Sequence, residues 1–106
     1  MPALSETVLN ALGDPTRRDI VMLLRSRPHS ITELAERLPV SRPAVSKHLT
    51  KLRAAELVAR QVSGTRHIYT LRHEGFEAAR AYLDQFWEVA LARYQLIAEN
   101  LQEFDS

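Results

Sequence analysis

Hydroxyl and cationic side chains recur along residues 40–58, which read VSRPAVSKHLTKLRAAELV. On a helical wheel Val45, Leu49 and Leu52 fall in one narrow apolar stripe, which predicts a buried face. Several of the other positions carry groups that can donate hydrogen bonds to phosphate oxygens or to base edges. These residues are Ser41, Arg42, Ser46, Lys47, Thr50 and Lys51, and Pro43 lies on the same side of the helix. The spacing therefore predicts a helix that packs with one face and binds a polyanion with the other.

Charge is distributed unevenly along the chain. Residues 1–73 hold 12 Lys and Arg against 6 Asp and Glu, whereas residues 74–106 hold 2 against 7. The formal net charge of +1 hides this asymmetry. A basic segment of this kind suits a nucleic acid better than a small substrate. A solvated basic surface without a ligand is the alternative that charge alone leaves open.

The residue types usual in catalysis and metal binding form no recognisable site. The chain has no cysteine, and its four histidines include no pair at the helical i,i+4 spacing. There is also no Gly-rich phosphate loop and no nucleophile elbow. We therefore expect no enzyme activity, no metal and no cofactor. We expect His48 at the edge of the core or at a phosphate, and His29 in a loop.

Helix-start residues divide the N-terminal part of the chain into short helices. Ser5 is expected to cap a helix over residues 6–12. Asp14 followed by Pro15 predicts a second helix, because an N-cap and a proline at the first helical position are both typical of a helix start.

A third helix precedes the polar helix directly. Ser30 and Glu33 fit a capping box, which predicts a helix over about residues 31–38. Only a few residues then separate it from the helix that starts at Ser41. Two short helices joined by a tight turn, with a polar outer face on the second, form a helix-turn-helix. A helical hairpin with solvated lysines is the alternative.

The segment after these helices has the pattern of a β-hairpin. The runs LVARQV and RHIYTL flank SGT, which predicts a hairpin over about residues 57–71 with its tip at residues 63–66. Arg60, Thr65 and Arg66 would place polar groups where phosphates or a narrow minor groove lie. A hairpin that follows a recognition helix directly is a wing. An ordinary surface hairpin with charged edges is the alternative.

Apolar residues recur every three or four positions along the acidic C-terminal segment, which predicts a long amphipathic helix over about residues 73–104. The stripe consists of Phe76, Ala79, Leu83, Phe86, Ala90, Tyr94, Ile97, Leu101 and Phe104, and Tyr82 and Trp87 widen it. At about 1.5 Å per residue, roughly 30 residues run to about 45 Å, which is more than one small domain can cover. We expect the first turns to pack on the domain, and the remainder to form a twofold dimer together with Leu4 and Val8. Packing of the whole stripe on its own chain is the alternative.

The segments ALGDPTRRDIVMLL, ITELAERLPVSRPAVSKHLTKLRAAELV and GTRHIYTL together resemble the winged helix-turn-helix of ArsR-family bacterial transcriptional regulators. The resemblance covers about residues 11–87. The continuation YLDQFWE is similar to the cysteine-free, autorepressor-like branch of that family. The resemblance implies a dimeric DNA-binding repressor that often controls its own operon.

Some positions depart from the family pattern. Two thiolates usually bind metal where this chain reads ELAERL, and its last helix lacks the histidine of a second metal site. The resemblance therefore implies no arsenic or zinc response here. Glu56 occupies a position that is often glycine in the family, so we expect the recognition helix to end differently.

These observations predict a mainly α fold with a small β-hairpin, namely a winged helix-turn-helix with a long C-terminal dimerisation helix, in one domain over residues 1–106. The expected function is sequence-specific binding of double-stranded DNA by a homodimer on an inverted repeat, in repression of its own operon. No apolar run approaches the roughly 18 residues that span a bilayer, and a cysteine-free chain fits the cytoplasm, so we expect no membrane partner. Two alternatives stay open: a regulator that binds a small molecule at the dimer interface, and a winged helix that binds only proteins.

Overall fold

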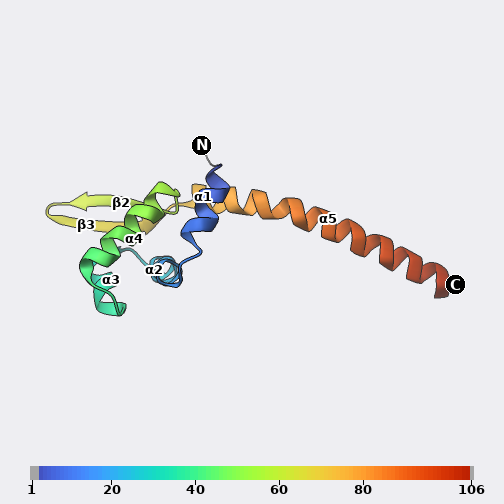
Figure 1. Cartoon of the computed structure of the whole chain (residues 1–106), viewed down its shortest axis with the longest axis horizontal. Coiled ribbons are helices and arrows are strands. Elements are labelled where there is room, and N and C mark those ends of the chain that lie inside the picture. Colours follow the sequence, from blue (N-terminus) through green and yellow to red (C-terminus); the bar gives the residue numbers. More distant parts are fainter. Residues whose placement is uncertain (1–2, 106) are drawn as a thin grey trace.

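Helices dominate the computed structural model, which describes residues 3–105, and its strands form one small sheet (Figure 1). In chain order the elements are α1 (Leu4–Ala11), α2 (Pro15–Ser26), β1 (His29–Ser30), α3 (Ile31–Arg37), α4 (Arg42–Ala54), β2 (Val58–Ser63), β3 (Arg66–Leu71) and α5 (His73–Asp105). α3 and α4 form the helix-turn-helix, and β2 and β3 form the wing. The predicted fold class, mainly α with a small hairpin and a long C-terminal helix, is confirmed.

Local capping interactions start three helices where the sequence predicts them. Asp14 caps α2 by accepting a hydrogen bond from the N–H of the third helical residue at 3.0 Å, and Pro15 occupies the first position. Ser30 and Glu33 form the expected capping box at α3, with both reciprocal hydrogen bonds at 3.1 Å. Ser41 caps α4 in the same way as Asp14 caps α2. Each cap satisfies N–H groups that a helix start otherwise leaves unpaired.

The start of α1 differs from the prediction that Ser5 caps it. α1 begins at Leu4, so Ser5 lies inside the helix, and the N-cap is Ala3, which has no side-chain cap. The extended backbone of Ala3 lets its carbonyl accept a hydrogen bond from the Thr7 N–H at 3.2 Å. The backbone alone therefore starts the first turn before Ser5 is reached.

The sheet has the order β1-β3-β2, and both pairings are antiparallel. Ser63 pairs with Arg66, so the wing turns through Gly64 and Thr65. Gly64 has a φ of 62°, as the first central position of a type II′ hairpin turn requires. The predicted tip of the hairpin is confirmed.

β1 is a strand that the sequence does not predict, and it places His29 in the sheet rather than in the expected loop. His29 lies opposite Tyr69 of β3 and is 1% exposed. Its Nδ1 lies 2.8 Å from the carbonyl oxygen of Arg27, which gives the buried ring a hydrogen-bond partner. A strand of two residues is too short to show an alternating pattern, so only its pairing with β3 defines it.

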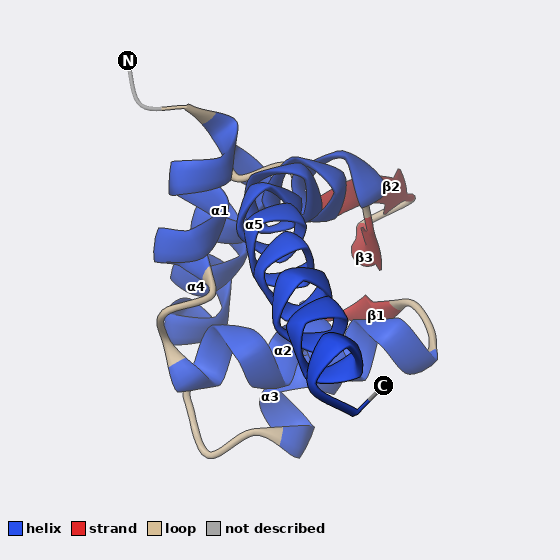
Figure 2. Cartoon of the chain, turned by 90° about the vertical axis from the view of Figure 1, so that its right-hand side faces the viewer, coloured by secondary structure: helices blue, strands red, loops and turns tan. Residues whose placement is uncertain are grey.

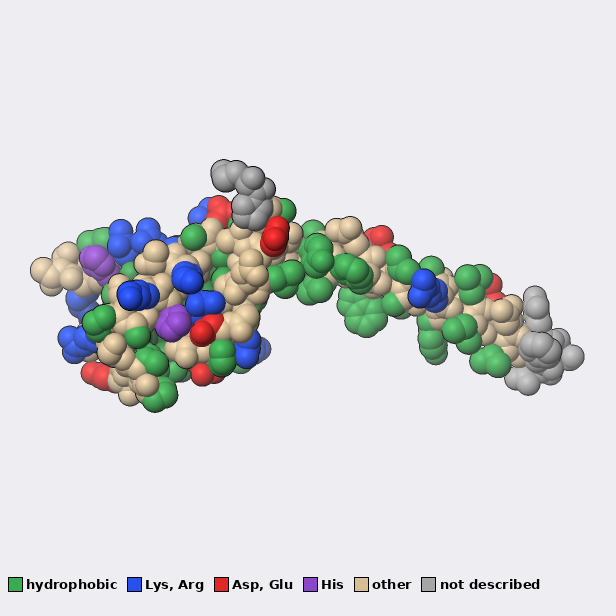
Figure 3. Space-filling model, viewed as in Figure 1, with side chains coloured by type: hydrophobic (Ala, Val, Ile, Leu, Met, Phe, Trp, Pro, Cys, Tyr) green, Lys and Arg blue, Asp and Glu red, His purple; other side chains and the backbone are tan. Residues whose placement is uncertain are grey.

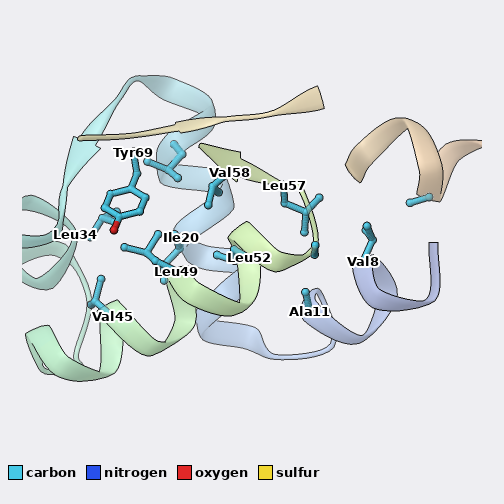
Figure 4. Close-up of a cluster of buried hydrophobic side chains, with 13 residues drawn as sticks. Val8, Ala11, Ile20, Leu34, Val45, Leu49, Leu52, Leu57, Val58 and Tyr69 are labelled. Atoms are coloured by element: carbon cyan, nitrogen blue, oxygen red, sulfur yellow. The ribbon is translucent and has the colours of Figure 1, made fainter. Parts of the chain in front are cut away.

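The core packs α4 against the sheet and the helices that precede it (Figure 4). Val45, Leu49 and Leu52 of α4 are buried as predicted, and Ile20 of α2 and Leu34 of α3 belong to the same cluster. Burying one large aliphatic side chain contributes about 1.5–3 kcal/mol. This cluster therefore fixes which face of α4 points inward and leaves the opposite face in solvent.

α5 is a rod that leaves the rest of the chain. Its 33 residues correspond to about 50 Å of helix, and the whole molecule measures 70 × 31 × 21 Å. α1 packs beside the start of α5, and the remainder of α5 projects into solvent (Figure 1, Figure 2). Side chains beyond residue 101 are not described, so the predicted place of Phe104 in the stripe lies outside the described residues.

Glu56 and Gly75 join the end of α4 to the start of α5. Glu56 has a φ of 56°, so α4 ends in the left-handed turn that glycine favours, and the expectation of a different helix end is wrong. The Gly75 N–H donates to the Glu56 carbonyl at 2.8 Å. A Cβ on Gly75 would lie 2.7 Å from that carbonyl oxygen and would also collide with the carbonyl of Ala55. Only glycine permits this close approach between the turn that follows α4 and the start of α5.

Candidate nucleic-acid interface

The outward face of α4 carries the polar residues that the sequence places there. Arg42, Ser46, Lys47, Thr50 and Lys51 are all exposed, as is Pro43 beside them. Cationic side chains gather over the part of the molecule that holds α4 and the wing (Figure 3). The buried face fixes the direction in which these groups point. An exposed helix face of this composition fits the major groove of DNA, which is wide enough to admit an α-helix.

Two of the predicted hydroxyl groups are already engaged within α4. The Ser41 oxygen accepts the Ala44 N–H at 3.3 Å, which leaves the Ser41 proton free to donate. The Thr50 hydroxyl donates to the Ser46 carbonyl at 3.0 Å, so its single proton is in use. A phosphate oxygen requires a donor. Ser41 can therefore contact phosphate as it stands, whereas Thr50 must first rotate.

Arg17 of α2 joins this face, although it was not among the predicted site residues. Its Nη1 lies 3.4 Å from Nδ1 of His48, and its Nε donates to the Ala11 carbonyl at 2.6 Å. Its Nη2 donates to the Asn10 carbonyl at 3.4 Å. One guanidinium therefore binds the last carbonyls of α1 and reaches the recognition helix. No local pattern in the sequence links residues 31 positions apart, so no signal could have identified this contact.

Asp14 adds a negative charge beside Arg17 and His48. The hydrogen bond from the Arg17 N–H lowers the pKa of Asp14 below its ordinary value, and the charges of Arg17 and His48 lower it further. Asp14 is therefore ionised at neutral pH and partly offsets the charge of Arg17. His48 itself is half-buried, which places it at the edge of the core.

The register of the wing places its two predicted cations on opposite faces. Directly paired residues of an antiparallel hairpin share a face, and successive residues of a strand alternate. Arg60 pairs with the buried Tyr69, so it lies on the face that packs on the core. Arg66 lies three residues from Tyr69 in β3 and is therefore on the other face. Arg60, Arg66 and Thr65 are all exposed.

Arg66 forms an ion pair with α3. Its Nη2 lies 3.4 Å from Glu33 Oε1, and Glu33 Oε2 lies 2.9 Å from Arg27 Nη1. The hydrogen bond from the Ser30 N–H, followed by the one from Arg27, lowers the pKa of Glu33 from its ordinary 4.5 to about 2. The carboxylate is therefore ionised throughout the neutral range and links the wing to α3.

Histidine and carboxylate side chains do not gather into a metal site in the described part of the chain. Between residues 3 and 105, no group of three or more such side chains is placed to hold a metal ion. Over the same residues, every helix is too short or too polar to cross a membrane.

The apolar stripe of α5 is exposed over most of its length. Its residues that are between 49% and 70% exposed are Leu83, Phe86, Trp87, Tyr94, Ile97 and Leu101. Tyr82 and Ala90 are also exposed, and Leu4 of α1 is half-buried. Val8 is completely buried in its own chain, which leaves its side chain no surface for the partner contact predicted for it. The exposed large apolar residues thus lie mostly in α5, while Leu9, Met22 and Val62 lie outside it.

The exposed polar face of α4 followed by a basic wing defines a class of protein, the winged helix-turn-helix DNA-binding proteins. The family described as bacterial regulatory protein, arsR family, matches residues 14–60. HTH-type transcriptional regulator Rv2034 of Mycobacterium tuberculosis is 52% identical over 90 residues, which cover 85% of this chain and 84% of that protein. The arsenical resistance operon repressor of Staphylococcus xylosus is 35% identical over 78 residues, which cover 74% and 75% respectively. This chain belongs to the ArsR family and is a transcriptional regulator, not an enzyme.

Solved structures extend the likeness beyond the helix-turn-helix. The ArsR-like transcriptional regulator from Rhodococcus sp. RHA1 is 34% identical with a TM-score of 0.73, over 90% of this chain and 92% of that one. The crystal structure of the ArsR family transcriptional regulator RHA00566 has a TM-score of 0.76 at 27% identity, over 84% and 92% respectively. The predicted family resemblance is therefore confirmed by sequence and by fold.

Proposed function

We propose that this chain is a homodimeric repressor that binds an inverted-repeat operator, controls its own operon and does not respond to metal. The observation that carries the proposal is the α4 face, whose cations and hydroxyls are exposed because Val45, Leu49 and Leu52 hold the other face in the core. Regulators of this fold insert such a helix into the major groove. A repressor of this kind acts by occupying a promoter on DNA in the cytoplasm.

The interface residues divide into those that read bases and those that hold the backbone. Arg42, Ser46 and Lys47 lie in the first two turns of α4, and Arg42 or Lys47 would read guanine, which presents two acceptors in the major groove. Arg66 would contact the backbone or the minor groove from the wing. The groups proposed to hold phosphates are Ser41, His48, Thr50, Lys51, Arg60 and Thr65, with Pro43 packed beside them.

A second copy of the chain is the proposed partner of α5. Soluble monomers rarely expose contiguous apolar patches larger than a few hundred Å². Phe86, Trp87 and Tyr94 supply large aromatic surfaces, and such residues are enriched in stable interfaces. A twofold dimer along α5 would cover the stripe of both chains and present two α4 helices to one face of DNA.

Metal independence is proposed because the sequence lacks the thiolates that bind metal in the family's sensors. A chelator should leave operator affinity unchanged, and stoichiometric zinc or arsenite should release no DNA. Tight metal binding that changes operator affinity would overturn this part of the proposal.

A hollow between α1 and α5 favours a second candidate, a regulator that responds to a small molecule. It has a volume of about 480 Å³, within the range of small-molecule sites, and is lined by Ala3, Ser5, Glu6, Leu9, Asn10 and Tyr82. Native mass spectrometry of the purified dimer would separate the candidates. A retained compound whose removal changes operator affinity favours the second.

A gel shift with the protein's own upstream DNA and a scrambled duplex, each across a salt series, tests the proposed function. Lys47→Ala should cost about 1–3 kcal/mol on the cognate duplex and much less on the scrambled one, because a base contact is lost. Arg25→Ala removes an exposed cation at the end of α2 and serves as the control. If Lys47→Ala loses the same affinity on both duplexes, Lys47 contacts a phosphate and not a base. Absence of any specific complex would favour a winged helix that binds only proteins.

A further inference from the structure

Glu33 brings together three segments of the domain at the base of the wing. Its Oε1 accepts the Ser30 N–H at 3.1 Å and lies 3.4 Å from Nη2 of Arg66, and its Oε2 lies 2.9 Å from Nη1 of Arg27. The capping box fixes the carboxylate in the first turn of α3. The carboxylate therefore occupies its position before Arg66 approaches.

The ion pair determines where the Arg66 side chain points in the DNA-free protein. Arg66 lies on the face of the hairpin away from the one on which α4 packs, and its guanidinium reaches towards α3. In this arrangement a carboxylate already neutralises the charge that would attract a phosphate. A phosphate that approaches the same Nη2 must displace Glu33, and one that approaches the other N–H groups of Arg66 meets a guanidinium whose charge Glu33 already offsets.

Breaking this ion pair is feasible because both partners are accessible and Glu33 keeps a second cation. The side chains of Arg66 and Glu33 are 64% and 31% exposed, and ion pairs in such positions are weak. When Arg66 leaves, the shorter contact between Glu33 and Arg27 remains. No buried charge is left without a partner, so the exchange between carboxylate and phosphate is reversible.

We propose that Glu33 is a positioning residue of the DNA interface, which competes with phosphate for Arg66 and so limits the strength with which the wing holds DNA. The inference rests on the proposed function, in which the wing contacts the operator. In this proposal the Glu33 carboxylate and a DNA phosphate replace one another as the partner of the Arg66 guanidinium. The wing then contributes less affinity than its charge alone would supply, which leaves more of the discrimination to α4.

Glu33→Gln tests the inference, because glutamine at the third helical position preserves the capping box while it removes the charge. Operator binding should tighten by about two- to fivefold for each half-site, the range expected for loss of an exposed ion pair. In the Arg66→Ala background the same substitution should change affinity by less than the error of the measurement. Arg27→Ala is the matched control, since it removes the other cation of Glu33 and should leave the effect of Glu33→Gln in place. Lys47→Ala on the same duplexes reports whether the proposed function itself holds.

Each other outcome contradicts the inference in a distinct way. Tightening of equal size in the Arg66→Ala background would mean that Glu33 simply repels DNA. Weaker binding by Glu33→Gln would mean that Glu33 orients Arg66 in the complex. In the unaltered protein, the NMR signal of the Arg66 guanidinium should shift on addition of the operator duplex, and an unchanged signal would show that the ion pair persists on DNA. This last measurement requires no variant and so does not depend on the folding of one.

Discussion

Glu56 holds a left-handed backbone conformation at the end of the recognition helix, with a φ of 56°. This conformation costs a residue with a Cβ about 1–2 kcal/mol. Part of that cost is offset by Arg72, whose Nη2 lies 3.4 Å from the Glu56 carboxylate. Glu56 thus keeps a conformation that glycine would adopt without strain. It also forms an ion pair with Arg72, the residue that precedes α5.

Glu56→Gly should therefore raise the free energy of unfolding by about 0.5–1 kcal/mol, after the loss of the ion pair and the greater freedom of glycine in the unfolded chain are included. Urea unfolding of the two proteins measures the difference. Glu56→Gln is the control, because it removes the charge and keeps the strain. A glycine variant less stable than the glutamine variant would show that the backbone is not strained.

Glu33 should make the stability of the protein depend on pH in the acid range. Its pKa falls from 4.5 to about 2 on folding, mainly through the Ser30 N–H, so the folded protein binds fewer protons than the unfolded chain. Its contribution to stability is fully present above about pH 5 and is lost as the pH falls through about 2. Urea unfolding of the unaltered protein and of Glu33→Gln should show a difference that shrinks over this range.

Glu36→Gln in the same helix provides the comparison for that titration, because Glu36 is exposed and lies outside the capping box. If the Glu33→Gln difference stays constant as the pH falls, the ion pairs and hydrogen bonds of Glu33 do not distinguish its two protonation states.

At the level of elements, the contact between the turn that follows α4 and the first turn of α5 depends on the absence of a side chain at Gly75. Gly75→Ala should lower the free energy of unfolding by about 1–3 kcal/mol, because the new Cβ meets the backbone carbonyls of Ala55 and Glu56, which cannot rotate away. Alanine favours a helix by up to about 1 kcal/mol over glycine, so any loss reflects this collision. Glu77→Ala, two positions along the helix and exposed, should have little effect. A more stable Gly75→Ala protein would contradict the close approach.

Helix starts and the hairpin could be predicted because their causes are local. Asp14, Ser30 with Glu33, and Ser41 each act within one helical turn, and Gly64 acts within a two-residue turn. The strand β1 could not be predicted, because its only cause is pairing with β3 far along the chain. For α1 the local signal was misleading, since the backbone of Ala3 begins the helix without a side-chain cap.

The features of the candidate site likewise divide into those that the sequence could predict and those that it could not. The outward positions of α4 followed from the helical period, since Val45, Leu49 and Leu52 fix the inner face. The contacts of Arg17 with His48 and of Arg66 with Glu33 join residues 31 and 33 positions apart. They depend on how helices and sheet pack together, which no spacing in the sequence expresses.

At the scale of the whole molecule, the proposed dimer should depend on the stripe of α5 and not on the folding of each chain. Phe86 is 60% exposed, so Phe86→Asp should leave the folding of the single chain intact while it introduces a charge into the interface. Sedimentation should show a dimer for the unaltered protein and a monomer for the variant, and operator affinity should fall with dimerisation. Gln95→Asp places the same charge at an exposed position nine residues further along, about 180° around the helix from Phe86, and should remain dimeric. A stable monomer of the unaltered protein at micromolar concentration would refute the dimer.

A single residue, Arg72, separates β3 from α5, and its N–H donates to the Leu57 carbonyl at 2.9 Å. Because no flexible linker precedes α5, the number of residues between Gly75 and the stripe determines the direction in which the stripe faces relative to α4. One residue inserted between Gly75 and Leu83 would turn the stripe by about 100° relative to α4, whereas seven would restore its direction to within about 20° and move it outward by about 10 Å. In the proposed dimer, the length of α5 up to the stripe therefore determines both the relative orientation of the two recognition helices and the distance between them along the DNA.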